Sequence, residues 1–308
     1  PANPTLVWLP EESSVGTHVL RPSAGMFAGG AGDVRFLLGV QYVHHWLNDR
    51  GGQWRSNVQV GYKTLLTTSL YQPFDVAQRY FVEPALFGVR SVEDVYVDSE
   101  RIAVYRFIDV GGSIDFGVNL GRSSQVRVGY ISTNRRAEVQ TGIATLPEID
   151  ARLPEIDARD AGLMASATYD SRERTTFAQH GMAVEVQYLQ SDDSLGGDRN
   201  WSRVEGGLSK AVPFGQNAIW VSLAGGADMG GDDLPGDRAF SLGGPRTLPA
   251  YQFGELRARS YWLASTSLLW RLVEIVPVKN QAIYAGFGLQ AAGLYDRVDR
   301  VEDGEVYA

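Results

Sequence analysis

Acidic side chains gather in two glycine-rich segments, residues 192–198 and 230–237. Carboxylates at that density could supply the oxygen ligands that Ca²⁺ prefers. Neither segment follows the calcium-loop pattern that ends in Glu, so we expect solvated surface loops instead. The chain has no Cys, which excludes thiolate metal sites and disulfide bonds. We therefore predict no metal site and no cofactor.

A serine hydrolase of the patatin or lipase type would need a Gly-x-Ser-x-Gly turn. The nearest match, Gly111-Gly112-Ser113, lacks the second Gly of that pattern. Two of the four His residues, His44 and His45, are neighbours in a strand-like run, so their side chains would point to opposite faces. We therefore expect no catalytic residues in this chain.

A long segment, residues 240–261, is punctuated by Gly and Pro and yet is rich in Phe, Leu and Tyr. Loops of this length without structure of their own are uncommon, and a disordered one would be poor in large apolar residues. We expect this loop to pack inside the rest of the chain. Three arginines lie in it: Arg246, Arg257 and Arg259. We favour their pairing with acidic side chains such as Asp115 and Glu185, and solvated arginines are the alternative.

Bulk properties narrow the class of protein. The 308 residues carry a formal net charge of −8, which argues against nucleic-acid binding. No run of about 18 apolar residues occurs, so we expect no transmembrane helix. The sequence begins at Pro1 without a signal peptide, and we expect it to be a fragment of a longer protein.

Alternation of apolar and polar residues dominates the sequence, and helical periodicity is nearly absent. Residues 53–63, 112–120 and 182–188 each place apolar side chains at every second position. Such alternation indicates strands that lie between an apolar and a polar environment. We expect strands at residues 18–28, 34–47, 53–70, 79–97, 100–109, 112–120, 125–143, 161–170, 181–191, 201–212, 218–228, 260–272 and 281–293, with a further strand beginning near residue 305.

These strands favour an antiparallel transmembrane β-barrel, and a soluble β-sandwich is the alternative. Many of them reach about ten residues, the length that a tilted strand needs to cross a bilayer. Short turns alternate with long connections, as in barrels with short turns at one end and long loops at the other. An arginine on a lipid-facing surface costs about 2–4 kcal/mol at mid-membrane, so Arg55 and Arg127 should point into the lumen.

A duplication, Leu-Pro-Glu-Ile-Asp-Ala-Arg, occupies residues 146–152 and again residues 153–159. Seven extra residues inside a paired strand would shift its register and reverse its faces. We therefore expect both copies in a solvent-facing loop, where insertions cost little.

The segment from Asp170 to Gly181 resembles the periplasmic turn of the BamA/TamA superfamily of outer-membrane barrels, also called bacterial surface antigens. That turn has an Asp, then an Asn, then Phe-Pro-x-x-Gly. Asp170, Phe177 and Gly181 match it, whereas Arg174 and Ala178 replace the Asn and the Pro. Gly181 can adopt a positive φ, and the Asp170 carboxylate can accept a hydrogen bond within its own turn.

The long loop is similar to the loop that folds back into the lumen in the same superfamily. The residues that we assign to the loop motif are Gly243, Gly244, Arg246, Leu248, Tyr251 and Glu255. Assembly factors of the superfamily carry Arg-Gly before the Tyr, where this chain has Pro249 and Ala250. Gln290 stands near the family's acidic partner of that Arg, so the resemblance makes Gln290 the expected partner of the loop. Loss of both charges together avoids a lone buried charge.

The chain most resembles the C-terminal barrel of patatin-like phospholipases of type V secretion, through residues 54–55, 70–74 and 80–84 and the missing loop Arg. The family barrel has about sixteen strands. We expect thirteen to fourteen here, since eight precede the Asp170 turn and eleven precede the long loop. Residues 1–308 would then form one barrel domain, truncated at its C-terminal end, without the upstream POTRA and patatin domains.

The resemblance implies a non-enzymatic barrel in the bacterial outer membrane, with the long loop directed into its lumen. It would anchor and translocate a passenger or POTRA domain attached upstream. The alternatives are a secreted phospholipase, in which the missing N-terminal domain hydrolyses lipids, and a passive porin. The partners implied are outer-membrane lipids and lipopolysaccharide, the upstream passenger, the barrel-assembly machinery, and a second copy of the chain in a homodimer. No nucleic acid is among them.

Overall fold

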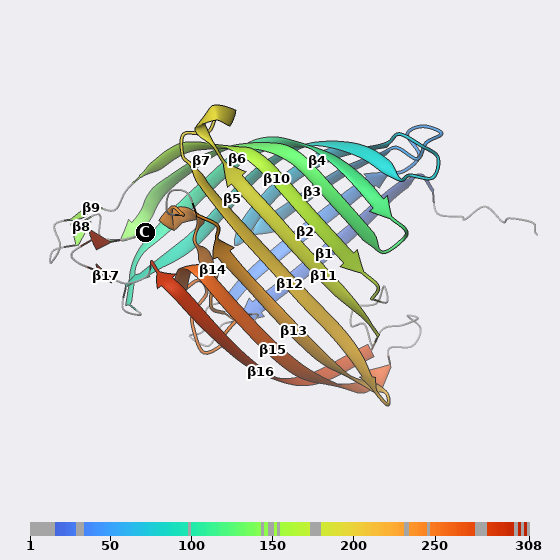
Figure 1. Cartoon of the computed structure of the whole chain (residues 1–308). Coiled ribbons are helices and arrows are strands. Elements are labelled where there is room, and N and C mark those ends of the chain that lie inside the picture. Colours follow the sequence, from blue (N-terminus) through green and yellow to red (C-terminus); the bar gives the residue numbers. More distant parts are fainter. Residues whose placement is uncertain are drawn as a thin grey trace, which may run out of the picture.

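The computed structural model describes residues 16–28, 34–97, 100–142, 145–146, 151–152, 155–172, 180–230, 234–244, 247–274, 282–298, 301–302 and 305–306. Fourteen strands form one antiparallel sheet, which curls into the wall of a barrel (Figure 1). They are β1 (His18–Ala28), β2 (Val34–His44), β3 (Gln53–Gly61), β4 (Lys63–Pro73), β5 (Tyr80–Val97), β6 (Glu100–Leu120), β7 (Ser124–Gly142), β10 (Ile156–Asp170), β11 (Gly181–Ser191), β12 (Trp201–Phe214), β13 (Asn217–Asp228), β14 (Phe240–Leu242), β15 (Leu256–Glu274) and β16 (Ala282–Arg297). The all-β barrel prediction is confirmed.

Short elements complete the described chain. Two-residue strands pair as β8 (Thr145–Leu146) with β9 (Ala151–Arg152) and as β17 (Val301–Glu302) with β18 (Glu305–Val306). Two 3-10 turns lie in connections, η1 (Asp193–Leu195) and η2 (Gly236–Arg238). No helix in the described ranges is long and apolar enough to cross a membrane.

The sheet follows the order of the chain. Each long strand pairs with the next long strand from β1 to β16, and β14 pairs with the first residues of β15. No ladder joins β1 to β16 among the residues that the structure describes. Backbone donors and acceptors are thus satisfied across the sheet, as a membrane requires, except along these two edges.

The number of strands agrees with the sequence analysis because two errors cancel. The expected strand at residues 53–70 is two strands, β3 and β4, joined by a tight turn at Tyr62. Gln59 lies opposite Leu65, so even-numbered side chains face outward on both sides of the turn and the alternation continues unbroken. The expected break near Gly111 does not exist, and β6 runs straight through it. Eight strands of the main sheet still precede the Asp170 turn.

The prediction for the second copy of the duplication is wrong. Residues 156–159 belong to β10 and pair with β7, where Ile156 lies opposite Ala137 and Arg159 lies opposite Asn134. β7 extends to Gly142, so its edge is available to the incoming chain. Because the repeat joins β10 at its first residues, it extends the ladder without shifting the register further along the strand.

The outer face of the barrel is apolar. Large side chains that a soluble protein would bury are exposed on it, among them Leu38, Leu66, Leu86, Phe116, Val128, Leu223 and Phe287. The opposite face of the same strands carries the charged residues, and both Arg55 and Arg127 point into the lumen as predicted, where each forms an ion pair with Glu83. Apolar outside and polar inside is the pattern of a membrane barrel.

The two ends of the barrel differ. The short connections 45–52, 74–79, 121–123 and 215–216 lie at one end, which we call the short-turn end. The connections 143–155, 192–200 and 229–255 lie at the other, which we call the long-loop end and which also carries the tight turn at Tyr62. Strands β5, β6 and β7 have 18, 21 and 19 residues and extend furthest at the long-loop end. Their inward side chains form a small core there, with Tyr105 and Phe107 buried.

Candidate functional site

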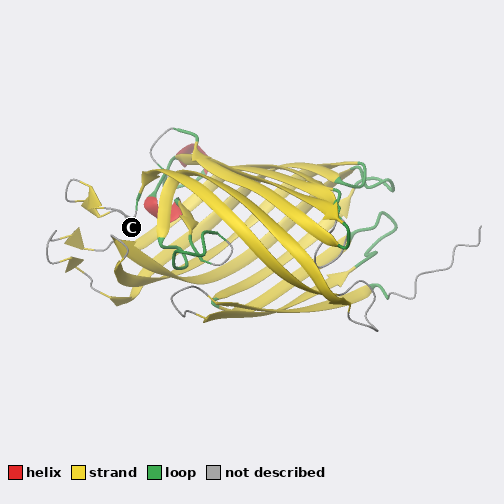
Figure 2. Cartoon of the chain, turned by 90° about the horizontal axis from the view of Figure 1, so that it is seen from below, coloured by secondary structure: helices red, strands yellow, loops and turns green. Residues whose placement is uncertain are grey.

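The connection between β13 and β15, residues 229–255, lies inside the curled sheet (Figure 2). We call it the lumen loop. It reaches strands that do not neighbour β13 or β15 in the sheet, since the Tyr96 hydroxyl on β5 donates to Gln252 Oε1 at 2.8 Å, and the Arg35 guanidinium on β2 lies 4.2 Å from the centre of the Phe253 ring. The loop therefore crosses the lumen at the long-loop end.

Glycine is required at the two motif positions where the loop turns back on itself. Gly243 and Gly244 have φ angles of +116° and +96°, which other residues rarely adopt. A Cβ atom on Gly243 would collide with the carbonyl oxygen of Gln252, and one on Gly244 would lie 2.7 Å from the Phe253 ring. The buried Glu255 carboxylate accepts the N–H of Gln252 at 2.7 Å and so closes the turn.

The loop also reaches the last long strand. The Leu248 N–H donates to Gln290 Oε1 on β16 at 2.5 Å, and the Tyr251 N–H donates to the Leu248 carbonyl at 3.1 Å. Leu248 has a positive φ of 64°, a conformation that costs a non-glycine residue free energy and needs such contacts to hold it. Gln290 thus lies against the loop through a neutral hydrogen bond. Arg246 lies outside the described residues.

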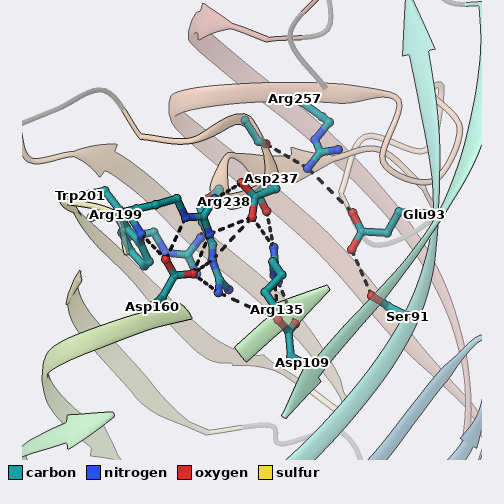
Figure 3. Close-up of polar contacts among 12 residues, drawn as sticks. Ser91, Glu93, Asp109, Arg135, Asp160, Arg199, Trp201, Asp237, Arg238 and Arg257 are labelled. Carbon is teal, nitrogen blue, oxygen red and sulfur yellow. Dashed lines mark hydrogen bonds and ion pairs between the residues drawn. The ribbon is translucent and has the colours of Figure 1, made fainter. Parts of the chain in front are cut away.

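Six charged side chains meet where the first part of the lumen loop reaches the wall (Figure 3). We call them the lumen ion cluster: Asp109 on β6, Arg135 on β7, Asp160 on β10, Arg199 before β12, and Asp237 and Arg238 on η2. Arg135 binds both Asp109 oxygens, at 2.7 and 2.8 Å, and donates to the Asp237 carbonyl at 2.5 Å.

Two carboxylates form the centre of this cluster. Arg199 bridges them, with Nη2 2.8 Å from Asp160 and Nη1 2.7 Å from Asp237. Asp160 also accepts from Arg238 and from the Trp201 indole N–H at 3.0 Å. Three arginines face three aspartates, so the cluster is neutral as a whole. Its bonds attach η2 of the lumen loop to three strands of the wall.

Burial opposes ionisation of the Asp237 carboxyl group. The hydrogen bonds and charge of Arg199 and the charges of Arg135 and Arg238 outweigh that effect and lower the pKa of Asp237 below its ordinary value. Burial also opposes the charge on Arg199, but its bonds to Asp237 and Asp160 raise the pKa of that guanidinium. Both side chains are therefore charged at neutral pH.

A second group of charged side chains lies in the lumen, nearer the short-turn end. Glu83 on β5 lies directly opposite Asp115 on β6, and both carboxylates are buried. Arg127 lies 3.0 Å from Glu83 and 4.0 Å from Asp115, while Arg55 lies 3.7 Å from Glu83. Ser69 donates to Glu83 at 2.8 Å. Two arginines offset two carboxylates that would otherwise repel each other across the ladder.

The turn after β10 brings Asp170 and Gly181 together at the short-turn end. Asp170 Oδ1 accepts the Arg172 N–H at 2.9 Å, and its other oxygen lies 2.8 Å from the Arg172 guanidinium. Gly181 has a φ of +101°, and a Cβ atom there would lie 2.5 Å from the Ser171 carbonyl oxygen. Phe177, the third residue of the turn motif, lies outside the described residues.

The expected pairing with an acidic side chain holds for Arg257, although its partner is Glu93 and not one of the two carboxylates that we named. Arg257 lies 3.9 Å from Glu93 and donates to the Gly236 carbonyl at 3.2 Å, while Arg259 donates to the Leu234 carbonyl at 3.0 Å. Asp115 instead faces Arg127. The register decides which inward charges meet, and alternation alone does not give the register.

The solvated interpretation of the acidic segments is also wrong for Asp237, whose side chain is only 3% exposed. Sequence reasoning missed the rest of the ion cluster as well. Asp109, Arg135 and Asp160 each occupy a strand position whose side chain points into the lumen. The alternation of the sequence could have identified them as lumen residues. No group of three or more His, Asp or Glu side chains suited to a metal ion occurs within the described ranges.

Comparisons with known proteins agree with this geometry. Residues 27–305 match the family model of the Omp85 superfamily domain. The fold is similar to the crystal structure of BamA from Haemophilus ducreyi lacking POTRA domains 1-3, with a TM-score of 0.68, 15% identity, and coverage of 91% of this chain and 58% of that one. It is also similar to CdiB from Acinetobacter baumannii, with a TM-score of 0.61, 10% identity, and coverage of 90% and 50%.

The chain thus spans 58% of the first solved protein and 50% of the second. No curated protein matches the sequence. At these identities the likeness to solved structures establishes the fold, and the match to the superfamily domain covers most of the chain.

Proposed function

The chain belongs to the Omp85 superfamily, and on that premise we propose that it anchors and translocates a passenger carried in the same polypeptide. It is an outer-membrane β-barrel of the translocation and assembly class. The proposal adds the upstream passenger and a non-enzymatic role for these residues. Outer-membrane lipids, lipopolysaccharide and the barrel-assembly machinery are the further partners that we propose for it.

The observation that carries this proposal is the lumen loop. A passive porin needs an open lumen, whereas here a loop that begins on β13 and ends on β15 extends to Tyr96 on β5 and to Arg35 on β2. Its η2 segment is bound to the wall by ion pairs that are largely shielded from water. These contacts support a plugged barrel in which the loop must shift before a chain can pass.

The bonds that hold the loop are suited to such a shift. Breaking the lumen ion cluster opens a short segment at a local cost, while the ladders of the wall stay paired. Hydrogen-bonded strands keep the barrel intact in lipid during this opening.

Conductance in planar bilayers tests the plug. We expect a stable increase in single-channel conductance when residues 240–255 are replaced by a short Gly-Ser linker, because β13 and β15 remain paired without the loop. Deletion of residues 146–152, one copy of the duplicated segment, serves as the control and should leave conductance unchanged. Unaltered conductance after removal of residues 240–255 would contradict the plug.

The upstream coding sequence tests the rest of the proposal. A Gly-x-Ser-x-Gly segment ahead of the barrel would favour a phospholipase parent, and several POTRA repeats would favour an assembly factor. An upstream sequence that contains neither feature would favour a porin and would count against an upstream passenger.

A further inference from the structure

A cavity of 1010 Å³ lies at the short-turn end of the lumen, far from the lumen loop. It is lined by the turns after β4, β6 and β10 and by inward side chains of β3, β6 and β7. Its charged lining consists of Arg55, Arg79, Arg122, Arg172 and Asp170. Four arginines and one aspartate give this lining a net charge of +3, although the chain as a whole carries −8.

Two of these arginines form no ion pair with the described residues. Arg172 is paired with Asp170 at 2.8 Å, and Arg55 lies 3.7 Å from Glu83. Arg79 and Arg122 are exposed, and no acidic side chain of the described residues forms an ion pair with either. An anion that enters the cavity therefore meets two positive charges that the protein itself does not neutralise.

The two turns that carry these arginines are held together. Asn119 at the end of β6 donates its backbone N–H to the Arg79 carbonyl at 2.7 Å and its side-chain amide to the Gln78 carbonyl at 2.5 Å. Gln125 in turn donates to Asn119 at 2.6 Å. Gln78 has a positive φ of 53°, a strained conformation that these bonds maintain. The arginines are thus presented by a fixed backbone, which reduces the entropy lost on binding.

The cavity continues across the lumen. A neighbouring cavity of 680 Å³ shares Thr168, Asp170 and Arg172 with it and is lined on its far side by Glu185 and Glu205. A single small anion would fill only a part of this space. An extended chain could place carboxylates at Arg79 and Arg122 while its backbone continues past the neutral polar side chains that also line the 1010 Å³ cavity, such as Ser123, Ser124 and Thr168.

We propose that the short-turn end of the lumen is a docking site for an acidic segment of polypeptide. The inference rests on the proposed translocation role only in assigning that segment to a passenger. Binding is measurable without transport, so a failure of docking and a failure of translocation give different results.

The test uses a fluorescein-labelled oligoglutamate peptide and the full-length protein in lipid nanodiscs, with anisotropy as the readout. Arg79→Gln with Arg122→Gln should weaken binding by about tenfold and flatten its salt dependence. The matched control is Arg136→Gln with Arg159→Gln, which removes the same charge from exposed positions at the long-loop end. This control should stay within about twofold of wild type, and heat-modifiable migration should show that both variants are folded.

Three results would overturn the proposal. The first is equal affinity of the wild type and the Arg79/Arg122 variant for oligoglutamate. The second is binding of an oligolysine peptide as tightly as oligoglutamate. The third is competition by inorganic phosphate, or by vesicles of phosphatidylglycerol, that is as effective per charge as competition by unlabelled oligoglutamate, since the site would then recognise any anion.

Discussion

Substitution of Asp237 by Asn should release η2 from the wall of the barrel. Asp237 and its partners Arg199 and Arg135 have side chains that are 3%, 21% and 13% exposed, so water screens these ion pairs little. Asp237→Asn leaves three arginines facing two carboxylates. Removal of one partner from a buried pair costs about 3–5 kcal/mol, and the low end applies because Asn keeps one hydrogen-bond acceptor.

Hydrogen exchange measures this effect directly. The Arg238 and Ala239 amides donate to the Pro235 and Gly236 carbonyls within η2, at 2.8 and 3.2 Å. A loss of about 3 kcal/mol in local stability should accelerate their exchange by about a hundredfold. The control is Asp157→Asn, which breaks an exposed ion pair with Arg136 and should change local stability by less than about 1 kcal/mol.

A double variant completes the test. Arg199→Gln added to Asp237→Asn removes the uncompensated positive charge, so exchange at η2 should slow again relative to the single variant. Exchange in Asp237→Asn that matches the exchange in Asp157→Asn would refute the assignment of the cluster as the lock on the loop. A double variant that exchanges faster than the single one by the full cost of both changes would refute the charge argument.

Three further predictions concern the pH dependence of loop stability, a glycine in the turn of the lumen loop, and the ion pair between Arg127 and Glu83. The pKa of Asp237 is lower in the folded protein than in the unfolded chain, so its stabilisation is complete above about pH 4 and disappears as pH falls through the lowered value. Protection of the η2 amides, taken relative to the intrinsic exchange rate at each pH, should therefore fall only in acid. Gly244→Ala should destabilise the lumen loop by about 2–3 kcal/mol, because Gly244 has a positive φ and a Cβ atom there would lie 2.7 Å from the Phe253 ring. The control is Gly121→Ala, at a positive φ with open space around it, which should cost about 1 kcal/mol by the same exchange measurement. Arg127→Gln leaves Glu83 and the carboxylate opposite it without their shared cation, and should lower the free energy of unfolding in urea by about 3 kcal/mol; an unchanged midpoint would show that water already neutralises them.

The barrel was predictable because its pattern is local. A strand between lipid and water alternates regardless of which strand lies beside it, so Val58 and Phe116 on the outer face and Arg55 and Arg127 in the lumen followed from sequence alone. The same locality explains the errors in strand boundaries. Side chains keep their phase through the Tyr62 turn, and residues 102–105 of β6 are apolar on both faces because Tyr105 packs inside the barrel.

The charge partners were not predictable for the opposite reason. Asp237 meets Arg135 from 102 residues away, and Arg238 meets Asp160 from 78 residues away. Such pairs depend on the register of every ladder between them and on where the loop descends. The glycine turn of the loop was easier to find, because Gly243 and Gly244 satisfy a local backbone requirement that their sequence reveals.

The pairing of Asp237 with arginine partners also bears on membrane voltage. Between Leu234 and Gly244 the lumen loop carries one negative and one positive side chain, Asp237 and Arg238, one after the other on η2. Movement of this segment along the barrel axis transfers no net charge, and an electric potential does about 2.3 kcal/mol of work per 100 mV only on each net charge moved. Displacement of η2 should therefore respond to the arrival of a ligand or a chain and be insensitive to the potential across the membrane.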